Sequence, residues 1–380
     1  MKILILYQFK NHDQTIEALY YKLIENDIKI STCNITTWKC RNIMMTRATF
    51  SVKLLFLLSK IPKVRGLLTA LFRDKVLLKL CDNYNIIDIH FFSPYYHRLI
   101  FELKDRKKKV KITIWGSDFY RVDSERREMQ RKIYQIVDLI QIETPQIAND
   151  FIGVYPELED KIRIAHFGIT QFEVIDELKS LINDNSSLRK SIDIPENKIV
   201  ITCGTNASPG QQHMQILESI KNLNAKHKKS IFLILPLTYG RASEKYVNNI
   251  LKKVETLDVP YLIFNTFLSK RDTGILRVVS DVLISIQVTD ALSSAIQEYM
   301  YSGNIIITGD WLPYNLLKDN GVFYITTSIE DLTETIKSTI DNIKTFKISC
   351  IDNKEILLRL SSWNEVIKKW ESIYNNMMIS

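Results

Sequence analysis

The sequence predicts an α/β protein with two Rossmann-like, doubly wound domains. Short apolar segments alternate with longer amphipathic ones along most of the 380 residues. The apolar segments are hydrophobic on both faces, which is typical of parallel strands covered by helices on two sides. A polar stretch at 170–196 divides the alternation into two halves. We therefore expect two domains that face a cleft at the carboxyl ends of their strands, where such folds bind ligands.

The first half contains a series of apolar segments that predict strands. They lie at 2–7, 28–35, 86–92, 110–116, 139–143 and 161–168. Helical patterns lie between them, at 14–26, about 95–104 and about 124–136. A further helix is expected to begin after Thr144 and Pro145. This half predicts a first domain that spans residues 1–175.

The second half repeats the alternation and predicts a second domain at 190–355. Its apolar segments lie at 199–204, 231–237, 261–266, 282–286, 304–309 and 322–326. The final segment, 364–376, predicts a helix with one apolar face. That face would carry Trp363, Val366, Ile367 and Trp370. We expect residues 356–380 to return to the first domain.

The composition indicates a soluble globular protein. Hydrophobic residues make up 46% of the chain and charged residues 25%. The five cysteines form no Cys-x-x-Cys pair, which predicts reduced thiols in the cytosol. The N-terminal apolar run is too short for a signal peptide, and no stretch reaches the ~18 apolar residues of a spanning helix. We expect the protein to be cytoplasmic.

The distribution of the net charge of +8 is more informative than its size. Between Val52 and Leu80, seven basic residues and one acid interrupt an apolar background, and a second basic run spans Lys104 to Lys111. Such a mixture suits the anionic inner leaflet of a membrane, where each Lys or Arg adds ~1 kcal/mol. Core helices with solvated lysine faces explain it equally well. Nucleic acid is a poorer partner, because interleaved exposed aromatic side chains are missing.

The most specific stretch is DALSSAIQEYMYSG, which begins at Asp290 and follows a predicted strand. Ser294 and Gln297 form a capping-box pattern, so a helix should start at Ser293 or Ser294 and end before the glycine. Asp290 would then lie in the loop and Glu298 in the first turns of the helix. A positive helix end beside two carboxylates suits a ligand that carries both phosphate and hydroxyl groups.

This stretch resembles the hallmark of retaining glycosyltransferases of the GT-B fold, particularly family 4. Their Glu-x7-Glu motif reads like EGLPSAILEAMACG, and here Asp replaces the first Glu. In that family the first acid and the following loop contact the donor sugar and diphosphate, and the second acid binds the ribose. The resemblance implies the first role for Asp290 and the second for Glu298. The loop residues that it assigns to the donor are Leu292, Ser293 and Ser294.

The loop after the first strand predicted for the second domain departs from the family 4 pattern. Family members usually carry an Arg and a Lys-Gly there, which neutralise the diphosphate, but CGTNASPGQQH has Asn206 and Gln211. The loop is similar instead to the GNSGDxSNxH segment of the fucosamine transferase of enterobacterial common antigen synthesis, and LPLTYG resembles its VPMGYP. Arg241 is the candidate for the missing cation. The donor contacts implied here are Gly204, Asn206, Ser208, Gly210, Gln211, His213 and Tyr239, with backbone groups approaching phosphate.

The first half resembles the same enzymes. IIDIHFFSPYYHRLIFEL is similar to their DIVHAH segment, WGSDFYR to their THGSD-like turn, and IRIAHFGI to their VIPNGID, so the resemblance spans about residues 86–320. It implies acceptor or cleft positions for Trp115, Gly116, Ser117 and His166. Trp115 would stack on a sugar or fill the end of the sheet. Asp118 would orient an acceptor hydroxyl, or Ser117 or Asp118 would cap a helix. His90 and His97 are expected to be ordinary strand and helix residues.

The resemblance implies a hexosyltransferase of surface polysaccharide synthesis at the inner face of the plasma membrane. The N-terminal domain would bind a glycan or lipid-linked saccharide acceptor, and the C-terminal domain a nucleotide sugar. Transfer would retain the anomeric configuration without metal or cofactor, and the catalytic candidates are Asp290, Arg241 and Asp118. Two alternatives stay open: a nucleotide-sugar epimerase of the GT-B fold, and a catalytically degenerate GT-B partner subunit.

Overall fold

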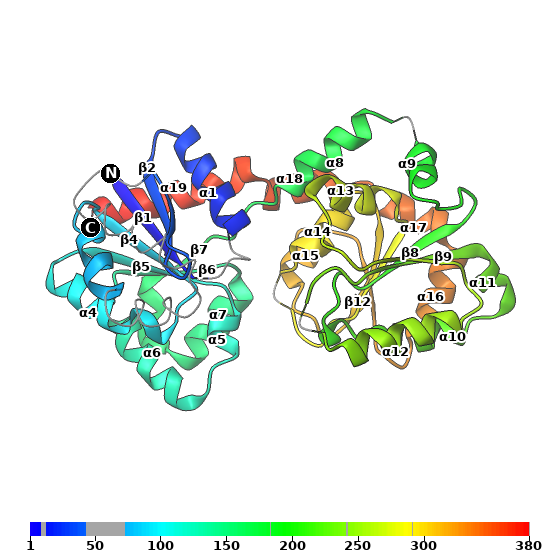
Figure 1. Ribbon diagram of the computed structural model, residues 1–380, viewed down its shortest axis with the longest axis horizontal. Helices are drawn as coiled ribbons and strands as arrows, with labels where there is room; N and C mark the ends of the chain where they lie inside the picture. The colour runs from blue at the N-terminus through cyan, green and yellow to red at the C-terminus, as the bar shows by residue number, and fades with distance from the viewer. Residues whose placement is uncertain (9–12, 43–72, 183, 241, 291, 380) are drawn as a thin grey trace. The chain divides into compact units, whose positions relative to one another are not determined.

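The computed structural model describes the chain except residues 9–12, 43–72, 183, 241, 291 and 380 (Figure 1). The chain forms two compact units. Met1–Gly168 and Trp363–Ser380 make the first, and Ile169–Ser362 makes the second. The first unit thus ends before residue 175, where the sequence placed the boundary. The return to it begins at Trp363 and not at residue 356, because the helix that precedes Trp363 packs in the second unit.

The first unit is built on a seven-stranded sheet of order β3-β2-β1-β4-β5-β6-β7. Its neighbouring strands are parallel except β2 and β3. The six strands predicted for this half are present, and a short polar strand, β3, adds an edge. The strands are β1 (Lys2–Tyr7), β2 (Lys29–Asn34), β3 (Lys39–Arg41), β4 (Ile86–His90), β5 (Lys109–Ile114), β6 (Leu139–Ile142) and β7 (Ile162–Ile164).

The hairpin of β2 and β3 corrects the expectation that all cysteines are reduced. The antiparallel register places Cys33 directly opposite Cys40, and the two form a disulfide. The partner of Cys33 depends on β3, which the sequence did not predict. The other three cysteines, Cys81, Cys203 and Cys350, are buried free thiols.

Helices cover the first sheet, and the expected start of the helix after Thr144 is confirmed. The Thr144 hydroxyl accepts a hydrogen bond from Ile147 N at 3.3 Å, and Pro145 is the first helical residue. The helical segments are α1 (Asp13–Glu25), η2 (Pro94–Tyr96), α4 (His97–Asp105), α5 (Ser117–Tyr120), α6 (Ser124–Ile136), α7 (Pro145–Val154), η3 (Pro156–Lys161) and α19 (Trp363–Ile379). Most of the basic stretch 52–80 lies outside the described residues.

The C-terminal helix α19 packs on the first unit beside α1 (Figure 1). Its predicted apolar face is confirmed, since Trp363, Val366, Ile367 and Trp370 are all buried in one hydrophobic cluster. That cluster also contains Ile3 and Ile5 of β1 and side chains of α1. Among the helices that the structure describes, none is long and apolar enough to cross a membrane.

The second unit has the six parallel strands that the sequence predicted, in the order β10-β9-β8-β11-β12-β13. They are β8 (Ile199–Cys203), β9 (Ile231–Pro236), β10 (Tyr261–Phe264), β11 (Val282–Ser285), β12 (Ile305–Gly309) and β13 (Ile325–Thr327). The strand order reverses between β8 and β11. In doubly wound sheets, ligands bind at the carboxyl ends of the strands beside such a switch point.

Two buried clusters, one on each face, hold helices to the second sheet (Figure 1). Helices α10, α12 and α16 pack on one face, and α8, α13 and α14 on the other. The helical segments are α8 (Gln171–Ser180), α9 (Ser186–Ser191), η4 (Pro209–Gln211), α10 (His213–Lys221), α11 (Ala225–Ser230), α12 (Glu244–Glu255), α13 (Lys270–Val279), α14 (Ser294–Tyr301), α15 (Asn315–Asp319), α16 (Leu332–Asp341), α17 (Ile343–Ser349) and α18 (Asn353–Ser361).

Candidate functional site

A chain of amide and carboxylate groups connects the loops at the switch point of the second sheet. Gln211 Oε1 accepts from Thr205 N at 2.9 Å, and Gln211 Nε2 donates to Gln287 Oε1 at 2.8 Å. Gln287 Nε2 donates to Asp290 Oδ2 at 3.2 Å, and the Tyr314 hydroxyl donates to the same oxygen. Gln211 therefore occupies a linking position between β8 and β11, and Asp290 is held by groups from two loops.

The start of the loop after β8 requires a glycine. Gly204 has a φ of +71°, and a Cβ there would lie 2.9 Å from His213 Nε2. His213 is buried, and its Nδ1 lies 3.1 Å from the Tyr246 hydroxyl. Burial lowers the pKa of His213 to about 4. The imidazole is therefore neutral at pH 7 and adds no positive charge to this loop.

In the middle of this loop, three backbone N–H groups donate hydrogen bonds within the protein. Ser208 N donates to Asn206 Oδ1 at 2.9 Å, Gly210 N to Ser208 Oγ at 3.3 Å, and Ala207 N to the Tyr239 carbonyl at 2.6 Å. These three N–H groups are thus occupied within the protein, and the approach of the loop backbone to phosphate stays a prediction. The Asn206 and Ser208 side chains support the loop, which the sequence could not indicate because the bonds depend on its folded path.

Helix α14 begins where the sequence predicted. Ser293 is the N-cap, and its hydroxyl accepts from Ile296 N at 3.5 Å. The predicted capping box between Ser294 and Gln297 is wrong, because Ser294 is already the first helical residue. Gln297 instead donates to the Ser293 carbonyl at 3.5 Å. Leu292, just before the cap, packs against the hydrophobic cluster beneath α14.

Glu298 lies one turn into α14 and forms an ion pair that the sequence analysis missed. Arg277, on α13, contacts Glu298 Oε2 through Nε and Nη2, each at 3.0 Å. The guanidinium lies 4.2 Å from the centroid of the Tyr299 ring. Burial raises the pKa of Glu298, and Arg277 opposes this rise. The only sequence signal was one arginine inside the apolar run ILRVV.

Two exposed aromatic side chains follow β9 and β10. Tyr239 is 54% exposed and Phe267 70%, with ring centroids 6.4 Å apart. The predicted cation Arg241 is two residues after Tyr239 in sequence but lies outside the described residues. Its role at the diphosphate therefore stays a prediction.

Asp118 connects two loops of the first unit. Its carboxylate is 3% exposed and accepts from Phe92 N and Trp115 N, both at 2.9 Å. These donors follow β4 and β5. Burial raises the pKa of Asp118 to about 7, although the backbone hydrogen bonds oppose the rise. The carboxylate thus supports the loops, and neither Asp118 nor Ser117 caps α5, whose N-cap is Gly116 with a φ of +90°.

The other residues assigned to the acceptor are largely packed inside the first unit. The Trp115 ring contacts those of Phe167, at 4.7 Å between centroids, and His90, at 6.1 Å. This geometry favours the alternative in which Trp115 fills the end of the sheet. His166 is buried, and its carbonyl accepts from Trp370 Nε1 at 2.8 Å. The assignment of His166 to the acceptor stays a prediction.

A buried charge cluster lies on β4 and β5 beneath α19. Asp88 and Lys111 are fully buried, with Lys111 Nζ 2.8 Å from Asp88 Oδ2. His90 Nε2, at 3.1 Å, and the Tyr374 hydroxyl, at 2.6 Å, contact the same oxygen. Burial lowers the pKa of Lys111 to about 8, while Asp88 opposes this. The cluster is a structural core, which agrees with the prediction that His90 is a strand residue.

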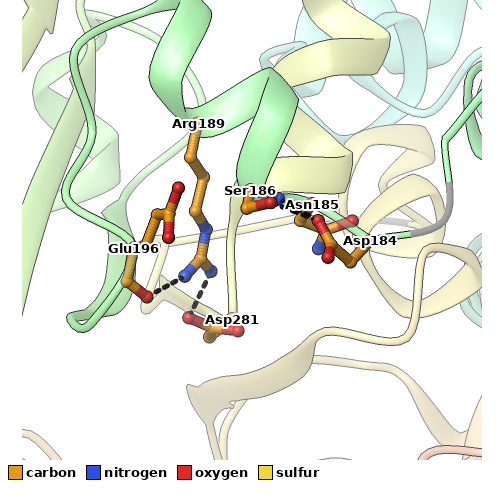
Figure 2. A pocket seen from close by; sticks show the side chains of 6 residues that line it. All are labelled: Asp184, Asn185, Ser186, Arg189, Glu196 and Asp281. Carbon is orange, nitrogen blue, oxygen red and sulfur yellow. Dashed lines mark hydrogen bonds and ion pairs between the residues drawn. The ribbon is translucent and has the colours of Figure 1, made fainter.

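The second unit also contains a pocket of about 400 Å³ at the other edge of its sheet. It lies beside Asp281, which precedes β11, and Arg189 of α9 (Figure 2). Arg189 Nη2 contacts Asp281 at 2.7 Å, Nη1 the Glu196 carbonyl at 3.4 Å, and Nε the Val279 carbonyl at 3.1 Å. Each guanidinium nitrogen is used within the protein. Arg189 therefore connects the segments around the pocket, and the pocket is not our candidate site.

The described residues contain no group of three or more His, Cys, Asp or Glu side chains placed to hold a metal ion. The candidate site is the carboxyl edge of the second sheet, where Asp290 and Glu298 lie on either side of the N-cap of α14. Of the residues predicted from the sequence, this edge brings together Gly204, Asn206, Ser208, Gln211, His213, Tyr239, Leu292, Ser293 and Ser294.

No family model matches the chain, and no curated protein sequence matches it. Solved structures resemble it over its full length. A glycosyltransferase from Rickettsia africae is 16% identical, with a TM-score of 0.73 and 99% of each chain covered. Anabaena HepE in complex with UDP is 12% identical, with a TM-score of 0.70, 99% of this chain and 100% of that chain covered.

A UDP-GlcNAc 2-epimerase from Neisseria meningitidis, bound to UDP-GlcNAc, is also similar. It is 14% identical, with a TM-score of 0.61 and 100% of both chains covered. At such identities the likeness concerns the fold. The chain has the GT-B fold of two parallel-sheet α/β domains, which confirms the fold class predicted from its sequence.

Proposed function

We propose that the protein is a glycosyltransferase that moves a sugar from a nucleoside diphosphate to a saccharide acceptor. The observation that carries the proposal is the position of Asp290 and Glu298. They lie on either side of the N-cap of α14, beside the switch point of the second sheet, where doubly wound folds bind ligands.

The N-terminus of α14 suits a phosphate group. Its cap is Ser293, and its first turn contains no acidic residue. The unpaired N–H groups of a helix N-terminus and the helix dipole attract anions. Asp290, oriented by Gln287 and Tyr314, would accept hydroxyl groups of the transferred sugar. Glu298 would accept those of the ribose.

The structural neighbours support a nucleotide-sugar donor. HepE has been solved with UDP and with UDP-glucose, and the Neisseria epimerase with UDP-GlcNAc. A UDP-sugar is therefore the first donor class to test. The sugar itself depends on contacts that a ligand-bound structure would define.

The leaving diphosphate needs stabilisation as its bond to the sugar breaks. We assign this stabilisation to the N-terminus of α14 and to Arg241, in the segment after β9. Such stabilisation of developing charge is electrostatic catalysis. The resemblance to family 4 favours attack by the acceptor hydroxyl on the face from which the diphosphate leaves. That course retains the anomeric configuration and uses no metal ion.

The acceptor is proposed to be a glycan or lipid-linked saccharide of surface polysaccharide synthesis. The support is the basic, apolar stretch 52–80 and the loop after β8 that resembles the fucosamine transferase. Attachment to the inner face of the plasma membrane would bring the enzyme to such an acceptor.

An epimerase is the second candidate, supported by the Neisseria structure. The two activities differ in their need for an acceptor. A transferase consumes the donor productively only with acceptor present, whereas an epimerase converts it alone. Incubation of each candidate donor with and without membrane-derived saccharide lipids, followed by separation of the products, distinguishes them.

The donor site is tested by thermal unfolding with ADP, CDP, GDP, UDP and dTDP. A ligand at ~100 times its Kd stabilises the folded state by ~2.7 kcal/mol, so at least one should raise Tm clearly. Glu298→Ala should weaken that ligand by ~1.5–3 kcal/mol, because a charge-assisted hydrogen bond is lost. If the folded wild-type protein responds to none of the five, the proposed donor site is wrong.

A further inference from the structure

The ion pair of Arg277 and Glu298 lies inside the proposed donor site. We infer that Arg277 is a positioning residue that neutralises Glu298, so that a carboxylate can bind ribose beside an anionic diphosphate. This inference rests on the proposed function. It adds a requirement that the family motif does not contain, since the motif specifies the acid and not its partner.

The first argument is the geometry of the pair. Nε and Nη2 of Arg277 both contact Oε2 of Glu298, each at 3.0 Å. Within the described part of the chain, no hydrogen bond reaches the other carboxylate oxygen, Oε1. The two side chains are 7% and 14% exposed. Arg277 thus fixes one oxygen of Glu298 and leaves the other for a hydroxyl donor.

The second argument is the way in which Arg277 itself is held. Its guanidinium packs 4.2 Å from the centroid of Tyr299, a fully buried ring on the same helix as Glu298. The Arg277 carbonyl accepts from Asn304 Nδ2 at 2.7 Å. Tyr299 of α14 and Asn304, which lies just before β12, therefore hold Arg277 before any ligand arrives, which reduces the cost of ordering it on binding.

The third argument is electrostatic. Glu298 is four residues after Ser294, which is ~6 Å along the helix axis from the N-terminus where phosphate is expected. An unpaired carboxylate at that separation would repel a diphosphate. With Arg277 beside it the pair has no net charge, and the carboxylate still accepts hydrogen bonds. Burial raises the pKa of Glu298, and Arg277 opposes this rise, which favours the charged carboxylate.

The test is a charge series at the pair: wild type, Arg277→Gln, Glu298→Gln and the double variant. Calorimetry would measure Kd for the best-bound of the five nucleoside diphosphates and for its nucleoside. The readout is the ratio of the nucleoside Kd to the diphosphate Kd. Arg277→Gln leaves a net negative pair and should lower this ratio ~10–100-fold, whereas Glu298→Gln should raise it about tenfold. The double variant should return to within about threefold of the wild-type ratio.

A matched control is Arg271→Gln, on the same helix, because Arg271 is 56% exposed and its partner Glu177 lies 3.5 Å away. It should change the ratio less than twofold. If Arg277→Gln does not fold, the other two variants test the same point. The ratio should rise in Glu298→Gln and return towards the wild-type value in the double variant.

An unchanged ratio across the series, with diphosphate and nucleoside weakened equally, would overturn the inference and leave a purely structural pair. Failure of the wild-type protein to bind any of the five diphosphates would instead overturn the proposed function, and the inference with it.

Discussion

The two units use charged side chains in different ways. In the first unit, the charges are buried and used within the protein: Asp118 accepts two backbone N–H groups, and Asp88 is paired with Lys111. In the second unit, neutral amides connect the loops, Gln287 and Tyr314 contact the carboxylate of Asp290, and Arg277 contacts one oxygen of Glu298. The first arrangement stabilises a scaffold, while the second, under the proposed function, would present oriented acceptors to a ligand.

The largest effect is expected where the first unit loses a buried charge. Lys111→Met would leave Asp88 without its ammonium partner in a fully buried position. Breaking such a pair typically costs ~3–5 kcal/mol. Urea unfolding should show this loss, and the surface control Lys368→Met should change stability by less than ~0.5 kcal/mol. A loss below ~1 kcal/mol would mean that the cluster does not hold the first unit together.

Asp118 should make the first unit less stable as the pH rises. Its folded pKa of about 7 lies above the ordinary value of 3.8, so from pH ~4 to ~7 the unfolded chain binds fewer protons than the folded one. Stability therefore falls across this window by ~2–4 kcal/mol from this group and is level above it. The difference between wild type and Asp118→Asn, measured by urea unfolding from pH 4.5 to 8, should shrink as the pH rises. If the difference in stability does not depend on pH, the pKa of Asp118 is not raised in the folded protein.

In the second unit the expected loss is in turnover instead of stability. Asp290→Asn keeps an acceptor for Tyr314 but removes the charge that would bind hydroxyls of the donor sugar. We expect turnover to fall ~10²-fold, in the range for a preorganised polar group, with Tm nearly unchanged. Parallel loss of Tm and activity would show that Asp290, like Asp118, is a structural residue.

The smallest effect per residue concerns membrane attachment. Sedimentation with anionic vesicles should weaken as salt rises, because surface attraction is screened over ~8–10 Å at physiological ionic strength. Changing Lys60, Lys63 and Arg65 to Gln should remove ~1 kcal/mol per residue. Binding that responds to neither salt nor mutation would favour the alternative of solvated helix faces.

Much of the candidate site could be predicted because its signals are local. Alternation of apolar segments predicted the strands of both sheets, and the stretch after β11 predicted the start of α14. The exceptions were short or depended on distant partners. Strand β3 has only three residues, two of them charged, and no apolar pattern, so neither it nor the disulfide between Cys33 and Cys40 was predicted.

The roles of individual polar residues were harder to predict. Asp118 looked like an acceptor ligand or a helix cap, yet its partners come from the ends of two strands. Asn206 and Ser208 were expected to let the backbone approach phosphate, and the sequence did not indicate that their side chains accept hydrogen bonds within their own loop. A sequence shows that a polar residue lies near a site, but not which donor or acceptor it meets there.

By itself, the sequence determined the two parallel sheets, the helix at the switch point and the two acids beside its N-terminus. These follow from hydrophobic periodicity and capping, which act over a few residues. Only the tertiary structure decided that Arg277 is the partner of Glu298 and that Lys111 is the partner of Asp88. Those residues lie 21 and 23 positions apart on different elements, and the packing of those elements brings opposite charges together where water cannot compensate them.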